Sequence, residues 1–155
     1  MRLSAYTKEA ALRPAMVERD LGTVVKRLAG VMTAAGYARD PMVLARDVMR
    51  REAEGGTAVE GGLVIPHATS EAAVGVHLAV ATLVHPITAR DADGAELPVD
   101  VVVMLTASPQ EARAMLRVLA RLARQIRGGL LARLREADSP AAMLALLRGD
   151  EPSST

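Results

Sequence analysis

Hydrophobic residues recur along this chain at two different spacings, and the change between them separates predicted helices from predicted strands. From residue 21 onward, apolar side chains return every three or four positions, the period of a helix with one buried face. Asp20 is placed to cap the start of this helix, and Gly36 suits its left-handed end. A second helix is predicted from Asp40-Pro41, a cap followed by a first-turn proline, to Gly55-Gly56.

The middle of the chain shows strand patterns instead. Residues 63–65 form a short apolar run after the Gly61-Gly62 turn, and a weaker strand is predicted within residues 10–17. Residues 74–83 alternate large side chains with small ones, so we expect a helix to cover the small-residue face, which also carries His77. Residues 99–105 are almost continuously apolar, as in a strand covered on both faces, and Asp91 to Gly94 has turn composition.

The last third of the chain is predicted to be helical. Ser108 to Glu111 has the pattern of a capping box, and residues 112–126 follow with an apolar face that includes Met115, Leu116 and Leu119. Short helices are expected at 130–137 and from Ser139-Pro140 to Leu147. Helices on both sides of a central sheet give an α/β class, a three-layer α/β/α sandwich. We treat residues 1–155 as one domain with a core of about 20–147, an irregular N-terminal arm and a disordered tail from Glu151 to Thr155.

Composition narrows the possible functions. The chain has no Cys, Phe or Trp and only two Tyr, which excludes thiolate metal sites and argues against modules that stack bases on aromatic rings. Its three histidines, His67, His77 and His85, have no metal-ligand spacing, so no metal and no cofactor are predicted. The formal net charge of +1 argues against nucleic-acid binding, and the arginine stripe at 113, 117, 121 and 124 is read as a solvated helix face. No apolar run reaches membrane-spanning length, so we expect a cytoplasmic protein without direct membrane insertion.

The stretch Pro66-His67 is the candidate site. Proline has no amide hydrogen, so we expect the sheet ladder to end there and to leave His67 at a strand end. Imidazole is a nucleophile at neutral pH and forms a transferable phosphoramidate. Phosphoryl transfer needs positive charge and donors around the phosphate oxygens, which Arg51, the hydroxyls of Thr69 and Ser70 and free loop amides would supply. A surface histidine and a solvated arginine at a helix end are the alternatives.

These residues carry a resemblance. Arg51-Glu52, Thr57 and the run from Gly62 to His67 resemble the pattern R-E-x-x-x-x-T-x-x-x-x-G-x-A-I-P-H of the enzyme IIA domains of the bacterial phosphotransferase system. The likeness is to the fructose/mannitol class, which includes the nitrogen-regulatory proteins, with Val64 at the usual Ala. It covers roughly residues 20–147 and implies a three-layer sandwich with a mixed sheet.

The resemblance also implies roles and partners. His67 would accept a phosphoryl group from the phosphohistidine of the carrier protein HPr and pass it to a cysteine of an enzyme IIB. Arg51 would neutralise the phosphoryl charge, and Thr57 would support the site. His77 and His85 match no family site. We predict that His77 is a strand residue and that His85 is a turn residue. With no IIB or membrane sequence attached, the chain is expected to act as a separate transfer domain.

One position departs from the family pattern. Relatives carry a second histidine that opens H-L-x-x-L in the helix after the last strand, and here that position is Met115. A thioether cannot donate a hydrogen bond to phosphate. Two alternatives therefore stay open beside a transferase. One is a regulatory protein whose His67 phosphorylation controls binding to other proteins, and the other is a relative of the family that is not phosphorylated.

Overall fold

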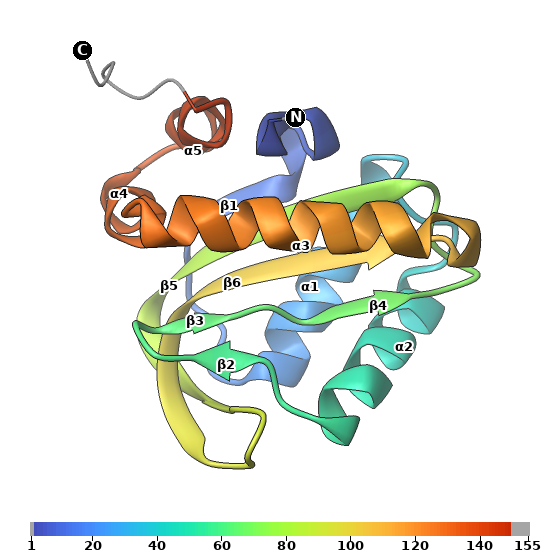
Figure 1. Ribbon diagram of the computed structural model, residues 1–155, viewed down its shortest axis with the longest axis horizontal. Helices are drawn as coiled ribbons and strands as arrows, with labels where there is room; N and C mark the ends of the chain where they lie inside the picture. Colours follow the sequence, from blue (N-terminus) through green and yellow to red (C-terminus); the bar gives the residue numbers. More distant parts are fainter. Residues whose placement is uncertain (1, 150–155) are drawn as a thin grey trace.

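The computed structural model describes residues 2–149, and the tail for which disorder is predicted lies outside them. The predicted helices and strands occur in the predicted order, and two further short strands and short 3₁₀ turns are added that were not predicted (Figure 1). The helices are α1 (Leu21–Ala34), α2 (Pro41–Glu54), α3 (Ala112–Arg127), α4 (Leu130–Glu136) and α5 (Pro140–Leu147). The strands are β1 (Leu12–Met16), β2 (Ala58–Val59), β3 (Leu63–Val64), β4 (His67–Thr69), β5 (Val76–Arg90) and β6 (Glu96–Ala107). The 3₁₀ turns are η1 (Leu3–Tyr6), η2 (Glu9–Ala11) and η3 (Pro109–Glu111).

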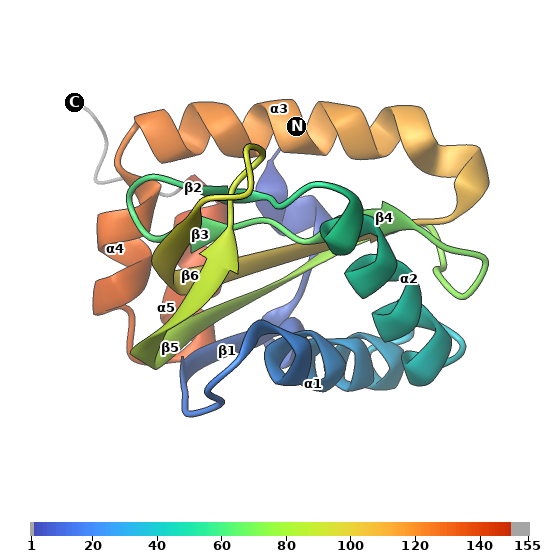
Figure 2. The same cartoon turned by 90° about the horizontal axis from the view of Figure 1, so that it is seen from below.

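The strands form one mixed sheet in the order β1-β5-β6-β3-β2, with β4 also paired to β6. β5 and β6 are antiparallel, whereas β1 runs parallel to β5, and both β3 and β4 run parallel to β6. Figure 2 shows the sheet between α3 on one side and α1 on the other. The predicted α/β class and the three-layer sandwich are confirmed.

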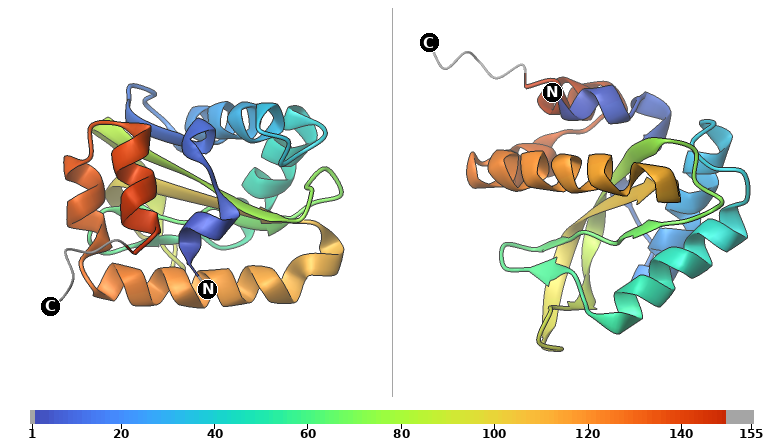
Figure 3. Two further views of the ribbon diagram at one scale, coloured as in Figure 1. Left: turned by 90° about the horizontal axis from the view of Figure 1, so that it is seen from above. Right: turned by 45° about the vertical axis from the view of Figure 1, so that its right-hand side comes forward.

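Each face of the sheet has its own apolar core. The small residues of β5, Ala79 and Ala81, pack with α1 and α2, which confirms the prediction that a helix covers them. Leu78 and Val80, on the opposite face, pack with α3, α4 and α5. In Figure 3 the N-terminal turns lie beside α5 on this second face. Fully burying a Leu or Val side chain contributes about 1.5–3 kcal/mol, so these two cores hold the sheet in place.

Helix ends follow the predicted caps with one exception. The side chain of Asp20 accepts from the Thr23 amide, Asp40 from the Met42 and Val43 amides, and Ser139 from the Ala142 amide. Ser108 makes no such bond, and the chain passes through η3 before α3 begins, so the predicted capping box is wrong. Proline at the start of η3 favours a tight first turn there instead.

Two strand predictions also need correction. The ladder does not end at Pro66: it is interrupted, and β4 resumes at His67 along β6, because the Pro66 carbonyl still accepts from the Leu105 amide at 3.0 Å. β5 runs on to Arg90, well beyond residue 83, so His85 is an exposed strand residue and not a turn residue. His85 lies where the β5–β6 register shifts between Thr82 and Ile87, a local irregularity that alternation alone does not reveal.

Candidate functional site

His67 lines a pocket of about 570 Å³ at the end of the sheet, between α2 and the start of α3. The pocket is lined by Asp47, Arg50, Arg51, Glu54, His67, Ala68, Thr69, Ser70, Glu71, Pro109, Met115 and Leu116. Three predicted site residues besides His67, namely Arg51, Thr69 and Ser70, therefore meet at one place. Met115 joins them from a helix about fifty residues away in sequence, as predicted.

One hydrogen bond fixes the chemistry of the His67 ring. Nδ1 of His67 lies 2.7 Å from the carbonyl oxygen of Ile65. A carbonyl oxygen only accepts, so Nδ1 carries a hydrogen and the lone pair of the neutral ring is on Nε2. Half-buried His67 thus presents Nε2 as its nucleophilic nitrogen.

The Ile65 carbonyl is itself positioned by a chain of contacts from the end of α2. The Ile65 amide donates to the Thr57 carbonyl at 3.4 Å. The Thr57 amide and hydroxyl donate to the two carboxylate oxygens of buried Glu52, at 2.9 and 2.7 Å. Thr57 does not line the pocket and acts through this chain, which ties the His67 segment to the helix that carries Arg51.

Arg51 lies in the last turn of α2 and is half-buried, not exposed as a solvated helix-end cation would be. Its Nη1 donates to the Gly55 carbonyl at 2.8 Å, which holds the guanidinium across the end of the helix. Gly56, the residue after Gly55, packs closely on the β5–β6 hairpin. A Cβ at this position would lie 2.0 Å from the Arg90 carbonyl oxygen. Only glycine fits at this position, and it anchors the helix end that carries Arg51.

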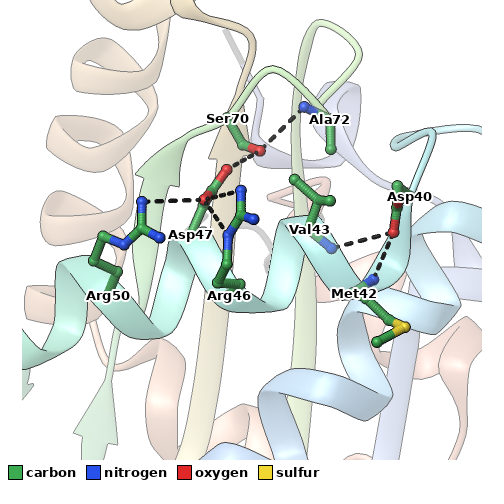
Figure 4. A network of polar contacts seen from close by, with 8 residues as sticks. All are labelled: Asp40, Met42, Val43, Arg46, Asp47, Arg50, Ser70 and Ala72. Atoms are coloured by element: carbon green, nitrogen blue, oxygen red, sulfur yellow. Dashed lines mark hydrogen bonds and ion pairs between the residues drawn. The ribbon is translucent and has the colours of Figure 1, made fainter.

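The hydroxyls predicted to contact phosphate differ in availability. Ser70 is buried, its hydroxyl donates to Asp47 at 2.7 Å, and the same oxygen accepts from the Ala72 amide (Figure 4). Its hydrogen is therefore committed, and Ser70 positions Asp47. Thr69 is exposed, and within residues 2–149 its hydroxyl has no partner. The predicted free loop amides are instead part of β4, and the Ser70 amide donates to the Ala107 carbonyl.

Sequence reasoning missed three charged residues of the pocket on α2. Asp47, Arg50 and Glu54 stand with Arg51 on one side of the helix. Their spacing of three and four residues places them on one helical face. This charged face of α2 is the feature of the sequence from which they could have been predicted. Burial alone would raise the pKa of Asp47, but hydrogen bonds from Ser70 and Arg46 and the charges of Arg46 and Arg50 outweigh it and hold that pKa below its usual value. Asp47 is therefore ionised at neutral pH.

Opposite α2, the wall formed by α3 is apolar. Met115 is 8% exposed and packs in the second core, which confirms its predicted place toward the sheet. Leu116 was expected in the core but is 61% exposed at the rim of the pocket. The inward face of α3 is carried by Met115, Val118 and Leu122.

The other two histidines lie outside this pocket. His77 is a strand residue, as predicted, and its ring stacks on Tyr37 with centroids 3.7 Å apart. Burial lowers the pKa of His77. Along α3, Arg113, Arg117 and Arg124 are exposed and Arg121 is half-buried, in keeping with a mainly solvated stripe.

Comparison with known proteins settles the family. The model of the family described as phosphoenolpyruvate-dependent sugar phosphotransferase system, EIIA 2, matches residues 12–149. The chain belongs to this family. The description of this family places it in the sugar phosphotransferase system. No helix among residues 2–149 has the length and apolarity needed to cross a bilayer.

Individual relatives agree with this placement. The EIIA chain is 32% identical, over its whole length, to part of the 2-O-α-mannosyl-D-glycerate-specific EIIABC component of Escherichia coli K12, and it spans only 24% of that protein. Its fold matches nitrogen regulatory protein IIA-Ntr of Neisseria meningitidis with a TM-score of 0.81 at 17% identity, over 94% of this chain and 98% of the other. It also matches a chain of the E. coli complex of enzyme IIAMTL with phosphorylated enzyme IIBMTL, with a TM-score of 0.73 at 14% identity, over 90% and 95%.

Proposed function

We propose that His67 is the phosphoryl acceptor of this EIIA protein, taking the group from phospho-HPr and passing it to a cysteine of an enzyme IIB. The observation that carries the proposal is the Nδ1 hydrogen bond to Ile65, which leaves the nucleophilic Nε2 on a ring that lines a pocket with two arginines. The family match and the fold shared with an enzyme IIA seen with a phosphorylated IIB support it. The relatives' names point to different substrates, so no particular sugar is proposed.

The proposed transfer has two steps. The Nε2 lone pair of His67 attacks the phosphorus of the donor phosphohistidine, a new N–P bond forms, and the old N–P bond breaks with its electron pair returning to the donor imidazole. The hydrogen on Nδ1 stays in place throughout. In the second step an IIB thiolate attacks the same phosphorus, and His67 recovers its lone pair. The guanidinium of Arg51 stabilises the charge on the three equatorial oxygens of the group in transit.

Phosphorylation of purified protein by enzyme I, HPr and phosphoenolpyruvate tests the proposal. His67→Ala and His67→Gln should take up no phosphate, measured by mass spectrometry under conditions that preserve phosphohistidine. His77→Ala and His85→Ala are matched controls and should be phosphorylated like the unmodified chain, since neither ring lines the pocket. Phosphate retained in both His67 variants, or found on His77 or His85, would refute the assignment.

A second candidate is a regulatory role in which phosphorylated His67 alters binding to other proteins, and Met115 is the observation that favours it. A wall without a hydrogen-bond donor stabilises the phosphoryl group less, which suits a protein that reports the phosphorylation state of its donor. Onward transfer distinguishes the two roles. Loss of phosphate from His67 on addition of IIB domains supports the transferase, and its retention with every IIB supports the regulatory role.

A further inference from the structure

The pocket around His67 has two cations on its lining, Arg50 and Arg51, and they differ in how firmly they are held. Arg51 is fixed by its hydrogen bond to the Gly55 carbonyl. The Arg50 side chain is 64% exposed, and within residues 2–149 its charge partner is Asp47, with Nη1 of Arg50 3.9 Å from Oδ1. That distance is an ion pair without a hydrogen bond. Arg50 is therefore the pocket cation whose donors are least committed.

Arg46 can be compared with Arg50 because both arginines contact the carboxylate of Asp47. Its Nε and Nη2 both donate to Oδ1 of Asp47, at 3.2 and 3.1 Å, and Figure 4 shows Arg46 and Arg50 approaching Asp47 from two sides. Arg46 lines a different, mostly apolar groove, between α1 and α2. The two arginines thus touch one acid, but only Arg50 faces the pocket of His67.

Asp47 is a fixed negative charge in this arrangement. Ser70 donates to one of its oxygens and Arg46 to the other, and Ser70 is itself held by the Ala72 amide. These hydrogen bonds fix the carboxylate from two sides. A phosphoryl group on His67 brings a charge of about −1.5 to −2 into a pocket whose lining has two arginines and three carboxylates.

We propose that Arg50 is the second phosphoryl-binding cation of this site, and that Asp47 is a positioning residue that holds Arg50 near the pocket while it is empty. This inference rests on the proposed function of His67. When the phosphoryl group arrives, Arg50 exchanges the distant carboxylate for charge-assisted hydrogen bonds to phosphate oxygens. Donors that the α3 wall lacks at Met115 are then supplied from α2. The fixed charge of Asp47 opposes the phosphoryl group and keeps its binding reversible.

The test is the equilibrium constant for phosphoryl transfer from phospho-HPr, measured by mass spectrometry at several donor ratios. Arg50→Ala should lower this constant about ten- to hundredfold, and Arg50→Lys should restore part of it. Asp47→Asn, which keeps an oxygen for the Ser70 hydrogen bond, should raise it about three- to tenfold. Arg27→Ala removes an exposed arginine of α1 and serves as the charge control. Thermal unfolding checks that each variant is folded.

Arg46→Ala separates direct contact from an indirect effect. If Arg50 acts only by holding Asp47, removal of Arg46 should have the same effect as removal of Arg50; we expect a change of only about twofold. Equal effects of the two variants, or no effect of Arg50→Ala, would overturn the inference. Failure of the proposed function shows in the unmodified chain, which would not be phosphorylated on His67. Failure of this inference shows in a chain that is phosphorylated but whose Arg50, Asp47 and Arg46 variants depart from these expected changes.

Discussion

The two helices that enclose His67 contribute opposite kinds of wall. α2 presents Asp47, Arg50, Arg51 and Glu54, whereas α3 presents Met115 and Leu116. The phosphoryl charge proposed for this pocket is therefore balanced from one side only. For the proposed transfer, this contrast places the demand for positive charge on the α2 arginines, more than in a pocket with a histidine at position 115.

The largest effect is expected when Arg51, the firmly held cation of the α2 side of the pocket, is removed. Arg51→Ala should slow phosphorylation of His67 by about one to three orders of magnitude, because a charged contact to the transferring group is lost. Stability should fall by about 1 kcal/mol, since the hydrogen bond to the Gly55 carbonyl is lost as well. Rapid-quench measurement of phosphate transfer from phospho-HPr gives the rate. An unchanged rate would make Arg51 a structural cap of α2.

Adding a donor to the apolar wall should have the next largest effect. Met115→His should raise the phosphorylated fraction in equilibrium with phospho-HPr, by about ten- to hundredfold in the equilibrium constant, since one polar contact is worth about 1.5–3 kcal/mol. Met115→Leu is the matched control, because it keeps the buried apolar side chain without a donor. Equal fractions for all three proteins would show that position 115 does not reach the phosphoryl group.

The smallest effect on transfer is expected from the chain of contacts behind the charged wall. Thr57→Val removes one of the two hydrogen bonds to the Glu52 carboxylate, which leaves a buried oxygen unpaired and should cost about 1–3 kcal/mol of stability. The transfer rate should fall by less than about fivefold, because the Ile65 contact uses the Thr57 carbonyl and not its side chain. Urea unfolding and the transfer rate together check this. A large loss of rate with unchanged stability would place Thr57 in the pocket itself.

Features that depend on local spacing could be predicted from the sequence, and features that depend on contacts between distant segments could not. Periodicity predicted α1 and α2 with their caps, the covered small-residue face of β5 and the inward direction of Met115. These features depend on local spacing. The resumption of the sheet at His67 does not, because it depends on pairing with β6, almost forty residues away.

Among the site residues, those in a linear pattern were easiest to predict. Arg51 and His67 stand in one, and the pocket brings them together. Asp47 and Arg50 were not predicted, because their contacts depend on Ser70 and on the pocket that β4 and α2 form together. Ser70 was expected to be an open donor, since sequence does not show that its hydroxyl already has an acceptor.

The break at Pro66 has a consequence for the entropy of the encounter between His67 and its donor. Without a partner for Nδ1, the imidazole would exchange among its staggered side-chain rotamers, and only some of them would suit the proposed donor. Here the Ile65 carbonyl, just before the break, holds Nδ1 and leaves one ring orientation. The rotational freedom of the ring is lost when the chain folds, before any donor arrives. For the proposed transfer, Nε2 is thus oriented before the donor binds, and this part of the ordering cost is already met by folding.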